Sequence, residues 1–101
     1  MDELLTWLKP QPNGLRTYKA FQQKVLALAA ADRAHAALYQ LLAAMVGHFI
    51  EHYEEHPLPS DVADGALNRL VGLVEKAAKS LKGSPADQLG VLNEIAATEL
   101  G

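Results

Sequence analysis

The chain has 101 residues, a formal net charge of −3 and no cysteine. The lack of cysteine excludes disulfide bonds, thiol nucleophiles and zinc sites with sulfur ligands. The acidic balance argues against nucleic acid as a partner, because a phosphate backbone requires a basic surface. Half of the residues are hydrophobic, and alanine and leucine, both strong helix formers, dominate. This composition predicts one helical domain over residues 1–101.

No apolar stretch approaches the roughly 18 residues that a membrane span needs. The first residues, MDELLTWLKP, are acidic and contain only a short apolar run, unlike a signal peptide. We therefore expect a soluble, cytoplasmic protein that does not bind membranes.

A short helix is expected over residues 2–9. Two acids lie at its start, where the helix dipole favours negative charge. Leu4, Trp7 and Leu8 share one face of this helix. Two prolines and an Asn-Gly pair within residues 10–14 do not continue a helix, so the element ends there.

Residues 15–56 contain no proline and as one helix would be about 60 Å long. Their apolar residues form two stripes that are offset by about 100° on an ideal helix. The first stripe is Tyr18, Phe21, Val25 and Leu28, and the second is Leu38, Leu41, Leu42, Met45, Phe49 and Tyr53. One straight helix would point these stripes at different cores. We therefore expect a break within residues 29–33 and helices over 15–30 and 32–56, with Asp32 as the cap of the second. The alternative is a continuous helix that packs on itself and on a second subunit.

Two further helices are expected over residues 60–82 and 85–100. Ser60 follows two prolines and is expected to cap the first of them, and Gly83 is expected to end it. Residues 84–87 combine a capping serine, a proline at the first helical position and an acid in the first turn. Short connections between amphipathic helices predict antiparallel neighbours. The predicted fold class is all-α, an antiparallel bundle of four main helices plus a short N-terminal helix.

Some apolar residues fall off the expected core stripes. In the last helix, the residues expected to face inward are Leu89, Leu92, Ile95, Ala96 and Leu100. The residues off the stripes are Leu26, Val62, Leu73 and Val91. Such residues either widen the core or expose a patch at which a partner docks. Trp7 is a further candidate for partner binding, since aromatic anchors are enriched at interface centres, although it could also cover the bundle as a lid.

The stretch HFIEHYEEHPLPS holds three of the four histidines. On a helix, His48, His52 and His56 form a ridge beside Glu51 and Glu55. The spacing H-x-x-E-H occurs twice, and in one class of zinc proteases two such histidines hold the metal while the glutamate polarises water. The metal hypothesis therefore uses these five residues, with a divalent metal such as zinc as the cofactor.

A catalytic zinc site also needs a third protein ligand and room for substrate, which a chain of this size hardly supplies. Histidines at the edge of an apolar face can instead bond to a glutamate three residues on or to water. No serine lies in a G-x-S-x-G context, and no phosphate-binding loop is present. We therefore expect no enzymatic activity, and metal binding without catalysis stays as an alternative.

The same part of the chain is acidic. Between Arg33 and Arg69 there is no lysine or arginine, but there are five acids. These acids, expected at the corner between the helices 32–56 and 60–82, are Glu51, Glu54, Glu55, Asp61 and Asp64. One interpretation of these acids is a polar corner that faces solvent. The other is a docking surface for a basic partner, because charge complementarity sets the association rate and the choice of partner.

This acidic corner leads us to predict a small non-catalytic protein-binding module, such as an adaptor, inhibitor or immunity-type protein. Its partner would present a basic surface. A dimeric structural helical protein is the other alternative, so a homodimer stays open.

Overall fold

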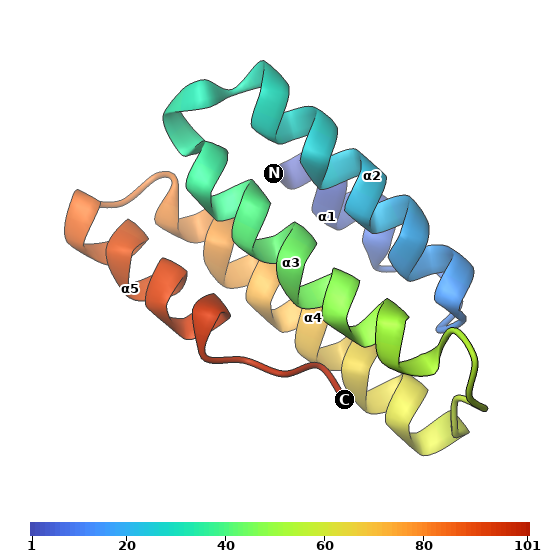
Figure 1. Cartoon of the computed structure of the whole chain (residues 1–101). Coiled ribbons are helices and arrows are strands. Elements are labelled where there is room, and N and C mark those ends of the chain that lie inside the picture. Colours follow the sequence, from blue (N-terminus) through green and yellow to red (C-terminus); the bar gives the residue numbers. More distant parts are fainter.

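A computed structural model describes residues 1–101 as an all-α bundle. Its elements are α1 (Asp2–Leu8), α2 (Leu15–Ala31), the 3-10 turn η1 (Arg33–His35), α3 (Ala36–Tyr53), α4 (Ser60–Ser80) and α5 (Pro85–Ala96). Figure 1 shows that α2 to α5 run antiparallel to their neighbours in sequence, while the short α1 lies against α4 on the far side. The predicted fold class is confirmed. None of the helices combines the length and the apolar character that crossing a membrane requires.

The chain reverses its direction at residues 32–35. α2 ends at Ala31 and, after the 3-10 turn, α3 begins at Ala36, so the predicted break is confirmed. The reversal turns the two apolar stripes toward one interior. As a result, Val25 of α2 and Leu42 of α3 are both fully buried in the same core.

Asp32 plays a different role from the predicted one. Its side chain caps no backbone group of the following turn, and its Oδ2 lies 2.7 Å from Nδ1 of His35. Burial raises the pKa of the nearby Tyr39 hydroxyl, and the Asp32 carboxylate adds to this effect by its charge and by a hydrogen bond. Because residues 33–35 form the 3-10 turn, α3 begins later than predicted.

The ends of α4 also differ from the prediction. Pro59, with an extended backbone, occupies the N-cap position, and Ser60 is the first helical residue without a side-chain capping bond. At the other end Leu81 is the C-cap. Gly83 does not adopt a left-handed conformation, so it is not the glycine cap that the sequence predicts.

α5 begins as predicted and ends earlier. The Ser84 hydroxyl accepts a hydrogen bond from the Asp87 amide at 3.2 Å, and the Asp87 carboxylate accepts one from the Ser84 amide at 3.1 Å. This reciprocal capping confirms the predicted helix start. The helix ends at Ala96. Residues 97–101 then continue beyond α5 along the bundle as an extended tail, in which Leu100 is buried.

All five helices contribute to the core. The largest fully buried side chains are Leu8, Tyr18, Phe21, Val25, Leu42, Val46, Leu70, Val74 and Ile95. Leu73, predicted to lie off the core stripe, is buried. Leu89, predicted to face inward, is 58% exposed, and Leu26 is 42% exposed. These two are the only large hydrophobic side chains left on the surface.

α2 and α3 pack more closely than any other pair of helices. The Gln22 side chain crosses between them, and its Nε2 donates a hydrogen bond to the Ala43 carbonyl at 3.1 Å. A Cβ atom on Gly47 would lie 2.8 Å from this same Nε2. Glycine costs a helix interior about 1 kcal/mol relative to alanine, and here it leaves the space that the amide occupies.

This packing predicts that the effects of Gly47 and Gln22 substitutions are coupled. With Gln22 present, Gly47→Ala should change the free energy of unfolding by less than about 0.5 kcal/mol, because the gain in helix propensity is offset by a displaced hydrogen bond. In the Gln22→Ala background the same change should stabilise the protein by about 1 kcal/mol. Urea denaturation of the four proteins measures both effects, and equal effects in the two backgrounds would refute the coupling.

Candidate functional site

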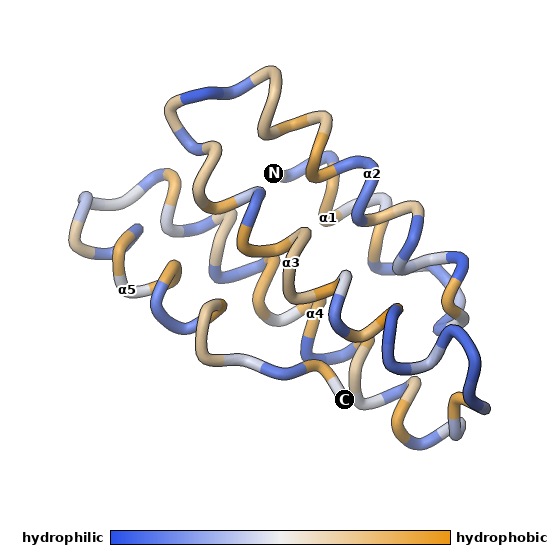
Figure 2. The backbone as a smooth tube through the Cα atoms, in the orientation of Figure 1, coloured by the Kyte–Doolittle hydropathy of each residue, from blue (hydrophilic) through white to orange (hydrophobic).

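The acidic corner lies where α3 ends and the chain turns into α4. It is defined as Glu51, Glu54, Glu55, Asp61 and Asp64, all of which are exposed. α3 ends at Tyr53, and Pro57 and Pro59 prevent the helix from continuing, because proline lacks a backbone N–H. Figure 2 shows this end of α3 and the connection after it as a strongly hydrophilic stretch. The predicted placement of the acids at one corner therefore agrees with the structure.

Two of the five acids have partners within the chain. Lys19 of α2 forms an ion pair with Glu54, with 3.0 Å between Nζ and Oε1. The Asn13 side-chain amide donates a hydrogen bond to Asp64. Both contacts join the start of α2 to the corner. Since both contacts are exposed, each contributes little to stability.

The other three acids have no such partner. Glu51, Glu55 and Asp61 take part in none of the ion pairs or side-chain hydrogen bonds within the chain. Asp61 lies in the first turn of α4, where the helix dipole favours a negative charge. These three carboxylates are free to meet cationic groups from outside.

The histidine ridge is interrupted by the end of α3. His48 and His52 lie on the helix and are exposed, whereas His56 lies beyond Tyr53. The predicted helix over 32–56 is too long by this last turn. His56 still folds back, with its Nδ1 3.1 Å from the His52 carbonyl and its ring 6.1 Å from the His52 ring. No three histidine, aspartate or glutamate side chains are placed to hold one metal ion. The histidines and glutamates of the metal hypothesis therefore do not form a set of metal ligands in this structure.

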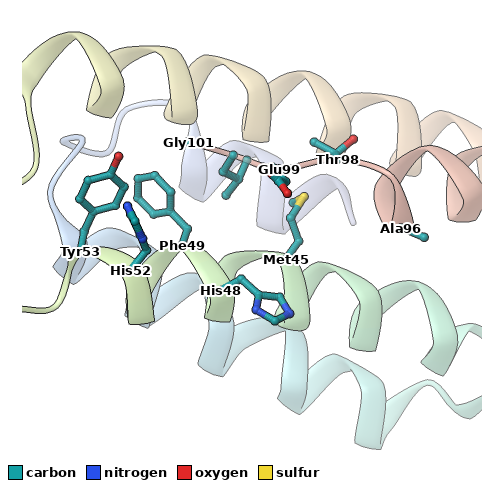
Figure 3. A pocket seen from close by; sticks show the side chains of 10 residues that line it. Met45, His48, Phe49, His52, Tyr53, Ala96, Thr98, Glu99 and Gly101 are labelled. Atoms are coloured by element: carbon teal, nitrogen blue, oxygen red, sulfur yellow. The ribbon is translucent and has the colours of Figure 1, made fainter.

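A groove of about 480 Å³ separates α3 from the tail. His48, His52 and Met45 line it on the helix side, and Thr98 and Glu99 line it on the tail side. Figure 3 shows Met45 projecting from α3 toward the tail, with His48 further from the tail at the edge of the groove. Sequence reasoning missed this groove, because it predicted a helix up to residue 100 and no extended tail beyond residue 96.

Trp7 lies away from the acidic corner. It lines a second groove, of about 630 Å³, between α1 and α2, and none of the five corner acids contributes to that groove. The Lys24 ammonium lies 4.9 Å from the centre of the Trp7 ring, within the range of a cation–π contact. The structure therefore does not combine the predicted aromatic anchor with the predicted acids.

Tyr18 lies buried beside the corner. Its hydroxyl donates a hydrogen bond to the Ala63 carbonyl at 3.3 Å, and its ring lies 4.7 Å from the ring of Phe49. Burial raises the pKa of Tyr18 from 10.0 to about 12, and the negative charge of Asp64 adds to the increase. The apolar stripe placed Tyr18 in the core but carried no signal for this electrostatic contact.

Comparisons of the chain with protein-family models, with curated proteins and with solved structures find no match.

The raised pKa of Tyr18 predicts a loss of stability in alkaline solution. The unfolded chain loses the tyrosine proton near pH 10 and the folded chain near pH 12. Stability is therefore unaffected below pH 10 and falls as the pH rises toward 12, by about 1.4 kcal/mol at pH 11. Urea denaturation at pH 8 and pH 11 should show this extra loss in the wild type and not in Tyr18→Phe. Equal losses in both proteins would mean that the hydroxyl ionises as freely as in the unfolded chain.

Proposed function

We propose that this chain is a small, non-catalytic protein-binding module that docks a basic partner surface through its acidic corner. One observation carries the proposal: Glu51, Glu55 and Asp61 are exposed together at one end of the bundle and have no ion-pair partner within the chain. A lysine or arginine of a partner can approach these carboxylates without displacing a native contact.

The charge distribution supports this proposal. The chain carries no lysine or arginine between Arg33 and Arg69, and within the corner only Glu54 has a basic partner, Lys19. An acidic region of this kind raises the rate at which a basic protein associates and disfavours acidic competitors.

The two engaged acids add to the surface in a different way. Glu54 and Asp64 already contact Lys19 and Asn13, so a partner restricts these two side chains less than it restricts free ones. Ordering before binding reduces the entropy lost on association. Adaptors, inhibitors and immunity-type proteins are the kinds of module that this surface suits.

A pair of matched variants tests the proposal. Glu55→Gln combined with Asp61→Asn removes two charges from the corner and leaves the contacts of Glu54 and Asp64 intact. The control, Glu3→Gln combined with Glu99→Gln, removes the same charge from α1 and from the tail, and neither glutamate has an ion-pair partner within the chain.

Extracts of the native host should yield a basic partner with the wild type and with the control. Quantitative mass spectrometry should show several-fold lower recovery with the corner variant, and recovery should fall as salt is raised above about 0.15 M. If the corner variant and the control recover every protein equally, the corner is not the docking surface.

A further inference from the structure

A second surface, the α3–α5 face, lies along α3 and α5. It is defined as Ala37, Leu41, Ala44 and His48 of α3 with Leu89, Leu92 and Ala96 of α5. Leu41 and Leu92 are half-buried, and the other five residues are exposed. On α3 these positions follow a four-three-four spacing, which is the spacing of a seam between packed helices. α3 therefore has, in addition to the stripe that faces the core, a second seam of one leucine, two alanines and one histidine.

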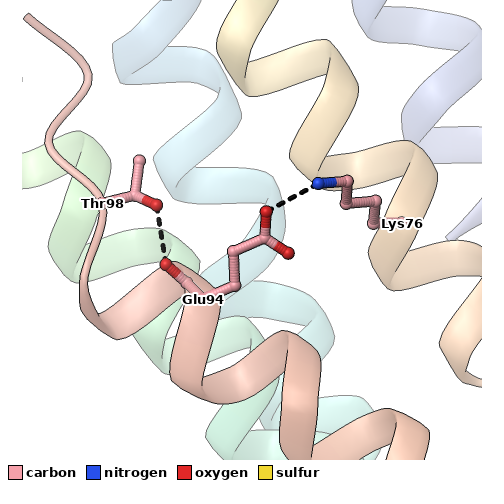
Figure 4. Close-up of polar contacts among 3 residues, drawn as sticks. All are labelled: Lys76, Glu94 and Thr98. Carbon is pink, nitrogen blue, oxygen red and sulfur yellow. Dashed lines mark hydrogen bonds and ion pairs between the residues drawn. The ribbon is translucent and has the colours of Figure 1, made fainter.

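The seven residues of the face carry no fixed charge, and Glu99 is the only charged side chain that lines the adjoining groove. Between Arg33 and Glu51 the sequence has no aspartate, glutamate, lysine or arginine. On α5, Glu94 turns toward α4, where its carboxylate lies 2.6 Å from the Lys76 ammonium (Figure 4). Asp87 is engaged in the cap of α5. Depletion of charge is the compositional mark of an interface centre. In a chain with a net charge of −3, this face lets two copies meet without facing like charges.

The two ends of the α3 seam have opposite charges. Arg33 lies just before α3 and Glu51 near its end, both are exposed, and neither forms an ion pair within the chain. Both lie about equally far along the chain from the midpoint of Leu41 and Ala44. In a dimer whose two-fold axis passes through that midpoint, the two α3 helices lie antiparallel to each other. This arrangement places Arg33 of each copy beside Glu51 of the other.

The same axis matches the exposed Leu89 with a groove. α5 runs in the same direction as α3 (Figure 1), with Leu89 near its start and Ala96 at its end. Ala96 lines the groove of about 480 Å³ together with Met45 and His48. Because the two-fold axis inverts the direction along α3, it brings Leu89 of one copy level with this groove on the other. The leucine that is 58% exposed in one chain thus meets a cavity in its neighbour.

The area is sufficient for a weak dimer. α3 has 18 residues, which corresponds to a length of about 27 Å, and two packed helices span a width of about 20 Å. Each copy then covers about 500 Å², or about 1,000 Å² in total, which is at the lower limit of specific interfaces.

We propose that the α3–α5 face is the interface of a symmetric homodimer. In this dimer the α3 helices run antiparallel, Leu89 fills the groove of the opposite copy, and Arg33 pairs with Glu51 across the two-fold axis. The area estimate predicts a reversible association that depends on protein concentration.

Sedimentation velocity over a range of concentrations tests the dimer with matched variants of the two exposed leucines. Leu89→Glu should be monomeric at concentrations at which the wild type and the control, Leu26→Glu, are dimeric. Circular dichroism confirms that both variants fold, as is expected for exposed positions. A wild type that stays monomeric up to about 1 mM overturns the proposal, and the occupant of the face would then be a different protein. Equal behaviour of the two leucine variants also overturns it.

A charge exchange tests the antiparallel arrangement. Arg33→Glu and Glu51→Arg should each weaken the dimer several-fold, because each places like charges together twice, and the double variant should restore it. Failure of the double variant to recover would rule out this two-fold axis.

The two surfaces share Glu51, which in the dimer pairs with Arg33 of the other copy, so the variants that separate the two proposals leave Glu51 unchanged. Leu89→Glu should still recover a basic partner from host extracts, and Glu55→Gln with Asp61→Asn should still dimerise. Loss of dimerisation in this corner variant would overturn the assignment of the interface to the α3–α5 face.

Discussion

The structure depends on the reversal of the chain between α2 and α3. The apolar stripes of these helices are offset by about 100° on a continuous helix, and only a reversal lets both face one interior. The turn at residues 32–35 provides it. Close packing of α2 on α3 then follows, and it requires a small residue, Gly47, where the Gln22 amide crosses. α5 packs against both α3 and α4, and α1 packs against α4, which completes the core.

The reversal also determines the surface. It brings the start of α2 to the end of α3, so that Lys19 engages Glu54 while Glu51 and Glu55 remain free. α3 then packs between α2 and α5, its core stripe faces the interior, and its remaining side faces solvent. That outer side is uncharged between Arg33 and Glu51. One helix therefore carries a core stripe, an uncharged face and, at its end, part of the acidic corner.

Much of the fold could be predicted from the sequence because it rests on local patterns. Helical periodicity predicts the helices, and the offset between the two apolar stripes predicts the break. The residues that follow Ser84 predict the capping of α5. What could not be predicted depends on contacts between distant residues. The tail packs along the bundle, where the Arg69 guanidinium donates a hydrogen bond to the Leu100 carbonyl, and it forms one wall of the groove. The acids lie at the predicted corner, but their division into engaged and free carboxylates depends on distant residues, Asn13 just before α2 and Lys19 within α2.

The most direct test of the account is the distance between positions 19 and 54. The chain has no cysteine, so Lys19→Cys with Glu54→Cys introduces two unique sites for spin labels. Pulsed electron paramagnetic resonance, on labelled protein diluted with unlabelled protein, reports the distance within one chain. The reversal predicts a distance within roughly 20 Å, since packed helices lie about 10 Å apart. A distance near 50 Å, the separation along a continuous helix, would contradict it.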